Sequence, residues 1–532
     1  MKKILFLLLV LPMGVCAQQD AWVYFADKEN VQISIDNPSS ILSQEAIDRK
    51  AMHNTPIDER DVPVNEDYIE DVKDQNGITV YAKSKWFNCV YVRGGEEDIN
   101  DLLDLSFVTE IQYADRSLNR SIDAFPFVKQ DPSQRIDFVY GTTENQVSML
   151  TVDQLHEQDY TGEGMIVAIL DSGFSGVDVQ PGFARIRDNG KLLNGYDFVG
   201  RVEDEFAFSG SDHGTRVVSN IAGFVQDQFV GTGPDAFIYC FRTEDVGSET
   251  PIEEALWVEA AERADSLGVD IINTSLGYRD FDNAAYSYTY DDMDGETAFI
   301  SRGATAAFEK GMLVVTSAGN SGSGMISAPA DAVGAFTVGA VDENGAYASF
   351  SSIGPSSDGR VKPDVMAKGQ NASVIGASGA ITTSNGTSFS SPIMAGAVAS
   401  IWQSFPQKTN AEMMQLIREV SSTFDNPTAE FGYGIPDFGA LLLQLLSVEE
   451  SAFAKEAYSI YPIPTSDRFQ VGLPQGSERA ELSLYNMLGK EVLRQRISSD
   501  QDWVEISHLA NGIYLARLES NEQASTLKII KS

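Results

Sequence analysis

The sequence predicts an α/β fold: a parallel sheet with helices on both faces, preceded by a small α+β unit and followed by a small all-β sandwich. The central part of the chain carries short, nearly continuous apolar runs at residues 165–170, 236–241, 269–273, 312–316 and 335–341. Helical patterns lie between some of these runs, for example at residues 253–264 and 298–309. This alternation is typical of strands that are buried on both faces of a parallel sheet.

The composition describes an ordinary soluble protein with an acidic surface. At 532 residues the chain is expected to form roughly three or four domains. Its net charge of −39 argues against binding to nucleic acid or to an anionic membrane. The three cysteines, Cys16, Cys89 and Cys240, are too few for a disulfide framework. Cys240 lies in an apolar run and is expected to be a buried free thiol.

Residues 1–17 are expected to be a secretory signal peptide. Lys2 and Lys3 precede a short apolar run, and small residues ending at Ala17 suit a cleavage site. Cys16 raises the alternative of a lipoprotein, for which Val15 is a poor fit. No other segment has about 18 consecutive apolar residues, so we expect an exported protein without a transmembrane segment.

Residues 18–135 are expected to form the small α+β unit. The patterns predict strands at 22–25 and 108–113, helices at 41–52, 67–72 and 96–105, and a strand-like stretch at 78–92 that bends near Ser84. His53 has no partner pattern and is expected at the surface near a helix end. Residues 117–140 lack periodicity and suit a linker with a cleavage site.

Residues 140–446 are expected to form the α/β domain, and one of its loops, at 279–296, is rich in Asp and Tyr. An EF-hand register fails there, because aligning Gly295 with the loop glycine puts Tyr290 and Ser301 at ligand positions. A solvated surface loop is expected, with a calcium site of another kind as the alternative.

Residues 457–532 follow a second linker at 447–456 and are expected to form the β-sandwich. Short strands are predicted at 469–473, 480–485, 491–496, 503–506, 513–518 and 525–529. A binding module for substrate or carbohydrate is an alternative role, but the pattern shows no exposed aromatic stripe.

A serine at the start of a helix is the strongest chemical signal. A turn led by Gly386 runs into an apolar segment at 393–402, which is expected to be a helix with Pro392 in its first turn. Ser388 would lie at or just before the helix N-terminus, where N–H groups and the helix dipole favour negative charge. A nucleophilic serine would suit this place, although a Ser/Thr-rich cap would also explain the cluster.

Three further polar residues occur at strand ends or helix starts. Asp171 ends an apolar strand, and His213 opens an apolar helix, where Gly214 indicates a close approach to the imidazole. Asn320 follows another strand and could donate a hydrogen bond to an oxyanion. Ser275, Leu276 and Gly277 also follow a strand and could line a cleft. Each piece alone also fits a turn or a cap.

Together, these residues resemble the subtilisin-like serine proteases, or subtilases. Acid, base and nucleophile follow in the order of subtilisin, and the strings Asp-Ser-Gly, His-Gly-Thr, Ala-Gly-Asn and Gly-Thr-Ser-x-x-Ser-Pro match over residues 145–445. The resemblance implies that Ser388 is the nucleophile, His213 the base and Asp171 its orienting acid. It further implies an oxyanion hole at Asn320 and a substrate cleft formed by Ser275, Leu276, Gly277, Ala318 and Gly319.

The resemblance also implies a biological setting. Residues 18–135 would be a prodomain that inhibits the enzyme, the substrates would be proteins or peptides, and no cofactor would be required. A structural calcium ion at a site that the sequence does not place is compatible with the acidic surface.

Residues 457–532 resemble type IX secretion sorting domains, through Tyr461-Pro462-Ile463-Pro464 (where Ile463 replaces the usual Asn), 484–490, 509–514 and a basic tail. This implies a type IX secretion partner and a secreted or cell-surface enzyme. The alternative, a binding protein on a degenerate protease scaffold, would lack a triad member, and none is missing.

Overall fold

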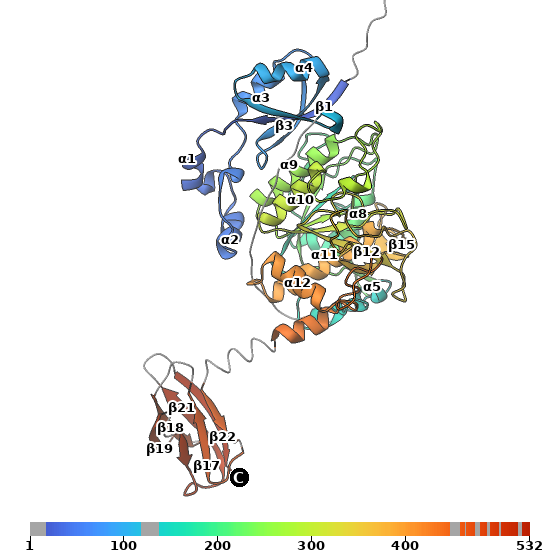
Figure 1. Cartoon of the computed structure of the whole chain (residues 1–532). Coiled ribbons are helices and arrows are strands. Elements are labelled where there is room, and N and C mark those ends of the chain that lie inside the picture. Colours follow the sequence, from blue (N-terminus) through green and yellow to red (C-terminus); the bar gives the residue numbers. More distant parts are fainter. Residues whose placement is uncertain are drawn as a thin grey trace, which may run out of the picture. The chain divides into compact units, whose positions relative to one another are not determined.

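A computed structural model describes residues 18–118, 138–446 and 458–531, with short gaps at 463, 474–478, 487–489, 499–501 and 520–523. The expected signal peptide at 1–17 and most of both expected linkers lie outside these residues. The chain forms two compact units that divide after Leu441 (Figure 1). Among the residues described, no helix is long and apolar enough to cross a membrane.

The first unit contains a sheet of seven parallel strands. Their order is β13 (Val365–Lys368), β12 (Ala335–Val341), β11 (Leu313–Ser317), β10 (Ile271–Thr274), β5 (Ile166–Asp171), β9 (Phe237–Arg242) and β6 (Tyr196–Asp197). The five strands expected from apolar runs are all present, within two residues of their predicted bounds. The very short β6 and the short β13 were not predicted from their sequences.

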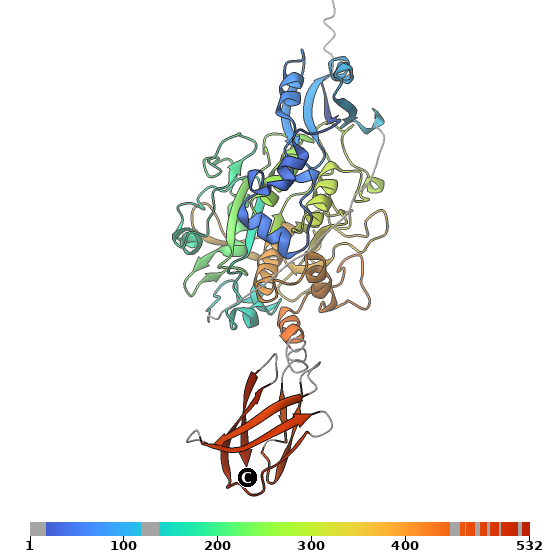
Figure 2. The same cartoon turned by 90° about the vertical axis from the view of Figure 1, so that its left-hand side faces the viewer.

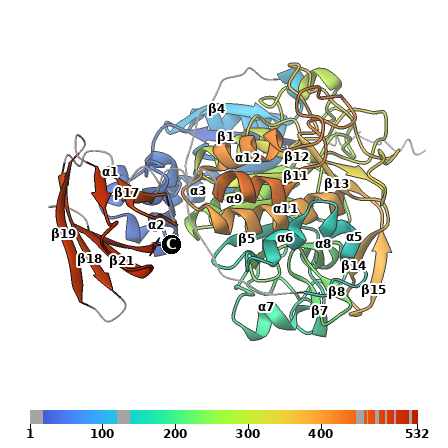
Figure 3. The same ribbon diagram turned by 90° about the horizontal axis from the view of Figure 1, so that it is seen from below.

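Helices cover both faces of this sheet. Helix α8 (His213–Ala222) packs against α11 (Thr387–Ser404), and α9 (Ile252–Ser266) packs against α10 (Phe299–Glu309). Figure 3 shows α12 (Asn410–Glu419) near α11 and the sheet. Short elements complete the unit: α5 (Glu144–Ser148), α6 (Val152–His156), α7 (Ala184–Asp188), and the hairpins β7 (Phe224–Val225) with β8 (Phe229–Val230) and β14 (Ala372–Ile375) with β15 (Ile381–Ser384).

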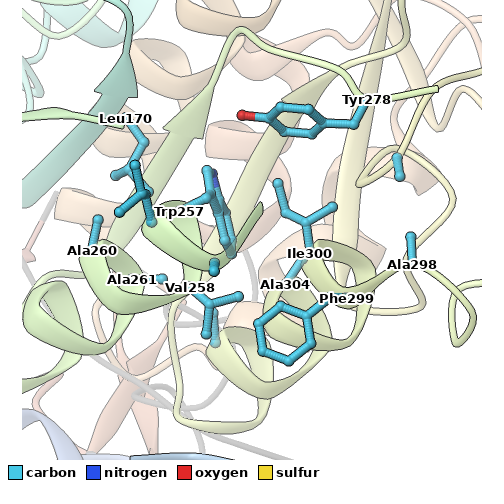
Figure 4. Close-up of a cluster of buried hydrophobic side chains, with 14 of the residues drawn as sticks. Leu170, Trp257, Val258, Ala260, Ala261, Tyr278, Ala298, Phe299, Ile300 and Ala304 are labelled. Carbon is cyan, nitrogen blue, oxygen red and sulfur yellow. The ribbon is translucent and has the colours of Figure 1, made fainter. Parts of the chain in front are cut away.

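The core under α9 and α10 is built around Trp257 (Figure 4). This fully buried indole packs with Val258, Ile300 and other apolar side chains, and its Nε1–H donates to Thr274 Oγ1 over 2.8 Å. Ala168 and Leu170 of β5 belong to the same core. Because successive strand residues point to opposite faces, Val167 and Ile169 are buried on the other face of the sheet.

The N-terminal part of the first unit is a four-stranded antiparallel sheet in the order β2-β3-β1-β4. The strands are β1 (Gln18–Phe25), β2 (Thr79–Ser84), β3 (Cys89–Gly95) and β4 (Val108–Tyr113), accompanied by α1 (Val31–Asp36), α2 (Gln44–Met52), α3 (Glu66–Lys73) and α4 (Glu96–Asp101). The stretch predicted to bend near Ser84 is the β2–β3 hairpin.

This N-terminal part packs on α9 and α10, as Figures 1 and 2 show. Trp22 stacks on Phe299 with ring centroids 4.7 Å apart. Glu262 of α9 accepts hydrogen bonds from the backbone N–H groups of Lys85 and Trp86 at 2.8 and 3.0 Å. Burial raises the pKa of Glu262 to about 7.

A second contact between the two parts consists of buried charges. Lys50 of α2 lies 2.8 Å from Asp265 of α9, and Lys310 lies 2.8 Å from Asp61. Arg49 also pairs with Asp265. Burial alone would raise the pKa of Asp265, but Lys50 and Arg49 hold it well below its usual value.

The same contact corrects the expectation that His53 is a surface residue. His53 does end α2, as expected, but only 2% of its side chain is exposed. The reason is tertiary: α2 packs against the turn at Gly311, and a side chain at Gly311 would lie 3.7 Å from His53 Nδ1.

The loop at 279–296 is only partly solvated, which corrects a second expectation. Asp291 is exposed, but Tyr286, Tyr288 and Met293 are buried. The Tyr288 hydroxyl donates to Glu254 over 2.7 Å, so the aromatic residues anchor the loop to α9. As expected, Cys240 is a buried free thiol.

The second unit is a β-sandwich of antiparallel strands. One sheet has the order β16 (Ser459–Tyr461), β17 (Arg468–Gly472), β20 (Trp503–Glu505), and the other has the order β19 (Glu491–Ser498), β18 (Arg479–Asn486), β21 (Gly512–Glu519), β22 (Ala524–Lys531). Alternating residues such as Leu482, Leu484 and Phe469 form its core. All six predicted strands are present, and β16 is added.

A buried histidine beneath α11 gives the fold a pH dependence. His156 Nε2 lies 3.1 Å from the carbonyl oxygen of Thr232, so this nitrogen carries the proton, and Nδ1 accepts from the Tyr140 hydroxyl at 2.9 Å. Burial lowers the pKa of His156 to about 4.

We therefore expect the free energy of unfolding to fall as the pH is lowered from about 6.5 towards 4. In that window the unfolded chain binds a proton at His156 and the folded chain does not, which removes roughly 3 kcal/mol. Urea titrations of the chain and of its His156→Gln variant at several pH values would measure this. A difference between the two proteins that does not change with pH would contradict the assignment.

Candidate active site

The candidate residues lie where the sheet and the helix starts meet. Asp171 is the last residue of β5, and Asn320 follows the end of β11. His213 is the first residue of α8, and Ser388 is the second of α11. The carboxyl ends of parallel strands share one edge of the sheet, which is where sites form in such folds.

Asp171 and His213 form a direct hydrogen bond. His213 Nδ1 lies 2.8 Å from Asp171 Oδ1, and the backbone N–H of Ser172 donates to the same oxygen at 2.7 Å. Asp171 is fully buried, whereas 32% of the His213 side chain is exposed. Because a carboxylate accepts, Nδ1 carries the proton and Nε2 is left as an acceptor on the open side.

Asp171 raises the pKa of His213. Burial alone would lower the pKa of the imidazole, but the charge and hydrogen bond of Asp171 more than reverse this effect, so the pKa lies above its usual value. Glu244 is a second carboxyl group in this region. It is half-buried after the end of β9 and accepts from the Tyr278 hydroxyl, and burial raises its pKa to about 8.

Gly214 explains how the acid and base come so close. A Cβ atom at Gly214 would lie 2.6 Å from the carbonyl oxygen of Gly173 and 2.7 Å from the Phe174 ring. The close approach predicted from Gly214 is therefore made by the loop after Asp171. Packing of this loop on the first turn of α8 holds the carboxylate against the imidazole.

Helix α11 begins at Thr387, so Ser388 lies at its N-terminus, as the sequence predicted. Pro392 lies in the second turn of this helix and not in the first, where it was expected. Gly386 precedes it with φ 149°, a conformation that favours glycine. The Ser388 hydroxyl donates to the carbonyl oxygen of Ser275 over 3.2 Å. Since a hydroxyl has one proton, that proton is not offered to His213 in this conformation.

Asn320 is fixed by the residue before Ser388. Its Oδ1 accepts from the backbone N–H of Thr387 at 2.9 Å and from Thr387 Oγ1 at 3.1 Å. An N–H group can only donate, so the amide orientation is determined and Nδ2 remains as a donor. A Cβ atom at Gly386 would lie 3.6 Å from this Nδ2, so the glycine keeps the space beside it open.

A polar cleft of about 280 Å³ adjoins Ser388 and Asn320. Its lining comprises Ser275, Leu276, Gly277, Arg279, Asp280, Ser317, Gly319, Asn320, Ser321, Ser327 and Ser388. All the residues predicted to border substrate lie here except Ala318, which is buried with Ile326 and Ala330. Within the described parts of the chain, no group of three or more His, Cys, Asp or Glu side chains is placed to hold a metal ion.

Two further polar residues near this edge of the sheet had weaker signals in the sequence. Glu244 follows the strand β9, and this position could have marked it. Asn273 lies inside β10, where an amide in an apolar run was the only sign.

Comparison with known proteins matches three parts of the chain to family models. Residues 162–434 match the model of the subtilase family, residues 20–131 that of the peptidase S8 propeptide domain of Bacteroidota, and residues 459–532 that of the secretion system C-terminal sorting domain. Subtilisin DY of Bacillus licheniformis is 31% identical over 294 residues, which cover 54% of this chain and 93% of that protein. Subtilisin Savinase of Lederbergia lenta is 28% identical over 293 residues, covering 54% and 94%. The crystal structure of MycP1 from Mycobacterium smegmatis covers 60% of this chain and 90% of that chain, at 22% identity and a TM-score of 0.46.

The chain belongs to the subtilase family. It is a subtilisin-like serine endopeptidase that carries a propeptide and is therefore made as a precursor. Its sorting domain belongs to the type IX route and makes it a secreted or cell-surface protein. Subtilisins need no cofactor for catalysis.

We expect the imidazole of His213 to titrate above pH 6.5, because Asp171 stabilises its protonated form. In the Asp171→Asn variant burial acts without that charge, so the pKa should fall below 6.5. Histidine NMR titrations of both forms in a Ser388→Ala background, which prevents self-digestion, would measure the two values. An unchanged pKa in the Asp171→Asn variant would contradict the pairing.

Proposed function

We propose that this protein is a secreted serine endopeptidase that cleaves peptide bonds through an acyl-enzyme on Ser388. The observation that carries the proposal is the 2.8 Å hydrogen bond between Asp171 and His213, at the sheet edge where Ser388 opens α11. A buried carboxylate that fixes the tautomer of a part-exposed histidine is the arrangement a general base needs.

In the proposed reaction, Ser388 Oγ attacks the carbonyl carbon of the scissile peptide bond. His213 Nε2 takes the hydroxyl proton and later gives it to the departing amine, while Asp171 stabilises the imidazolium between these steps. Water then attacks the acyl-enzyme, and the same histidine accepts its proton. The Ser388 hydroxyl first turns from the Ser275 carbonyl oxygen towards His213.

Asn320 and the backbone N–H of Ser388 are the proposed oxyanion hole. The determined amide orientation supports this role, because Thr387 occupies Oδ1 and leaves Nδ2 as the free donor. Ser388 lies at the N-terminus of an 18-residue helix, whose dipole adds positive potential at the developing oxyanion.

Replacing Ser388 by Ala is expected to abolish both peptide hydrolysis and labelling by a serine-directed phosphonate. Asn320→Asp should keep the acceptor for Thr387 but lose the donor, so kcat should fall by about 10²–10³-fold with little change in KM. Active-site labelling followed by peptide hydrolysis assays would measure both. Phosphonate labelling that persists in the Ser388→Ala variant would refute the assignment of the nucleophile.

The proposed division of the chain is a signal peptide at 1–17, a propeptide at 18–135, a catalytic domain at 140–446 and a sorting domain at 457–532. We propose that the propeptide inhibits its own catalytic domain and that the type IX secretion machinery recognises the sorting domain. Protein or peptide substrates follow from the chemistry. The packing of the N-terminal sheet on α9 and α10 and the buried charges around Asp265 support inhibition in place.

Replacing Asp265 by Asn should loosen the cleaved propeptide, because Arg49 and Lys50 would stay buried without their shared carboxylate. Loss of one partner of a buried ion pair typically costs about 3–5 kcal/mol, which corresponds to a loss of affinity of roughly 10²-fold to 4 × 10³-fold. The fraction of cleaved propeptide that co-purifies with the catalytic domain would measure this. The matched control is Glu66→Gln, which removes an exposed ion pair with Lys83 within the propeptide and should change nothing. Equal retention in the two variants would contradict the role of the buried cluster.

A further inference from the structure

The carbonyl group of Ser388 lacks its ordinary helical partner. In an α-helix, the carbonyl oxygen of residue 388 accepts from the N–H of residue 392. That residue is Pro392, which lies inside α11 and has no N–H. A buried carbonyl without a donor is unfavourable, so another group must supply the hydrogen bond.

Ser275 supplies that donor. Its Oγ lies 2.9 Å from the carbonyl oxygen of Ser388, and only 4% of Ser275 is exposed. The same residue accepts the Ser388 hydroxyl through its own carbonyl oxygen at 3.2 Å. The nucleophile's residue is therefore held at both its backbone and its side chain by one residue after β10.

Two fully buried side chains lie behind Ser275. Asn273 Nδ2 lies 3.1 Å from Ser275 Oγ, and Ser391 Oγ lies 2.9 Å from Asn273 Oδ1. Asn273 and Ser275 are two residues apart at the end of a strand, and Ser388 and Ser391 are three apart on a helix. Each pair therefore points to one side of its element, and the two pairs face each other.

These hydrogen bonds form a relay from Ser391 through Asn273 and Ser275 to the Ser388 carbonyl oxygen. The direction of donation along this relay follows from its last member, the carbonyl group. The Ser388 carbonyl can only accept, so Ser275 Oγ must use its single proton there. Ser275 Oγ must then accept from Asn273, which places Nδ2 on that side and Oδ1 towards Ser391. Ser391 is therefore the first donor, and every group in the chain has one assigned role.

We propose that Asn273, together with Ser391, is a positioning residue that holds the Ser388 turn in its reactive place through Ser275. Neither side chain lines the cleft, so neither is expected to contact the substrate. The relay compensates for Pro392 and fixes the peptide group that follows the nucleophile. Displacement of a reacting group by about 1 Å can reduce turnover by 10²-fold, so small losses of position at this turn should appear in kcat.

The test compares two adjacent buried serines in the mature enzyme, which is produced from the full chain. Ser391→Ala removes the first donor of the relay. Ser390→Ala is the matched control, because Ser390 is equally buried but its Oγ donates only to the Thr387 carbonyl oxygen at 3.1 Å. A third variant, Asn273→Asp, retains an acceptor for Ser391 and loses the donor to Ser275.

All rates are normalised to sites titrated with a serine-directed phosphonate. Ser391→Ala should lower kcat about five- to tenfold with KM nearly unchanged, as expected for the loss of one hydrogen bond, and Asn273→Asp should lower it further. Ser390→Ala should stay within twofold. A merely structural role would instead reduce the titrated fraction and the unfolding temperature, with kcat per titrated site unchanged.

The inference rests on the proposed nucleophile, but the two fail differently. If phosphonate still labels Ser388→Ala, the proposed function fails. If labelling requires Ser388 but Ser391→Ala matches Ser390→Ala in kcat per titrated site, the positioning role is overturned. The same conclusion follows if both variants lose only stability.

Discussion

The hydrogen bond between Asp171 and His213 joins the centre of the sheet to the start of α8, and the arrangement of the site depends on it. A carboxylate that is fully buried at a strand end is costly unless donors meet it. Here the Ser172 N–H and the imidazole both donate to Oδ1. The pair requires the Asp171 loop to pack against the first turn of α8, which only a glycine at 214 permits. One electrostatic requirement thus fixes a loop, a helix start and the tautomer of the histidine.

Buried charge plays a different part where the N-terminal sheet packs on α9 and α10. Arg49, Lys50 and Asp61 from the propeptide meet Asp265 and Lys310 in a cluster with almost no exposure to water. Such a cluster is weak evidence for stability, because desolvation offsets much of the attraction. It does discriminate strongly between states, because separation of the two parts exposes every charge to water at once.

The sequence predicted the strands of the parallel sheet well, because burial on both faces makes them continuous apolar runs. Its motif strings at strand ends gave candidate site residues. The structure brings Ser388, Asn320 and the Ser275 turn to one cleft, and it joins Asp171 to His213 by a hydrogen bond. Pro392 was expected in the first turn of α11 and lies in the second, because the Ser and Thr residues before it belong to the helix but carry no apolar period. The burial of His53 was missed for another reason: α2 packs against the turn at Gly311, far away in the chain, and no local pattern contains that contact.

The turn that carries Ser388, the proposed nucleophile, depends on contacts that the sequence pattern does not contain. Gly386 and Pro392, one on each side of Ser388, weaken the ordinary backbone constraints on this turn: glycine is conformationally free, and proline removes a helical hydrogen bond. Side chains replace what the backbone lacks. Thr387 binds Asn320 on one side, and Ser275 binds the Ser388 carbonyl oxygen on the other. The turn is therefore positioned by residues that follow β10 and β11, so its geometry is set by the sheet that also carries Asp171. A motif string can identify the serine, but only the folded sheet determines where its hydroxyl lies.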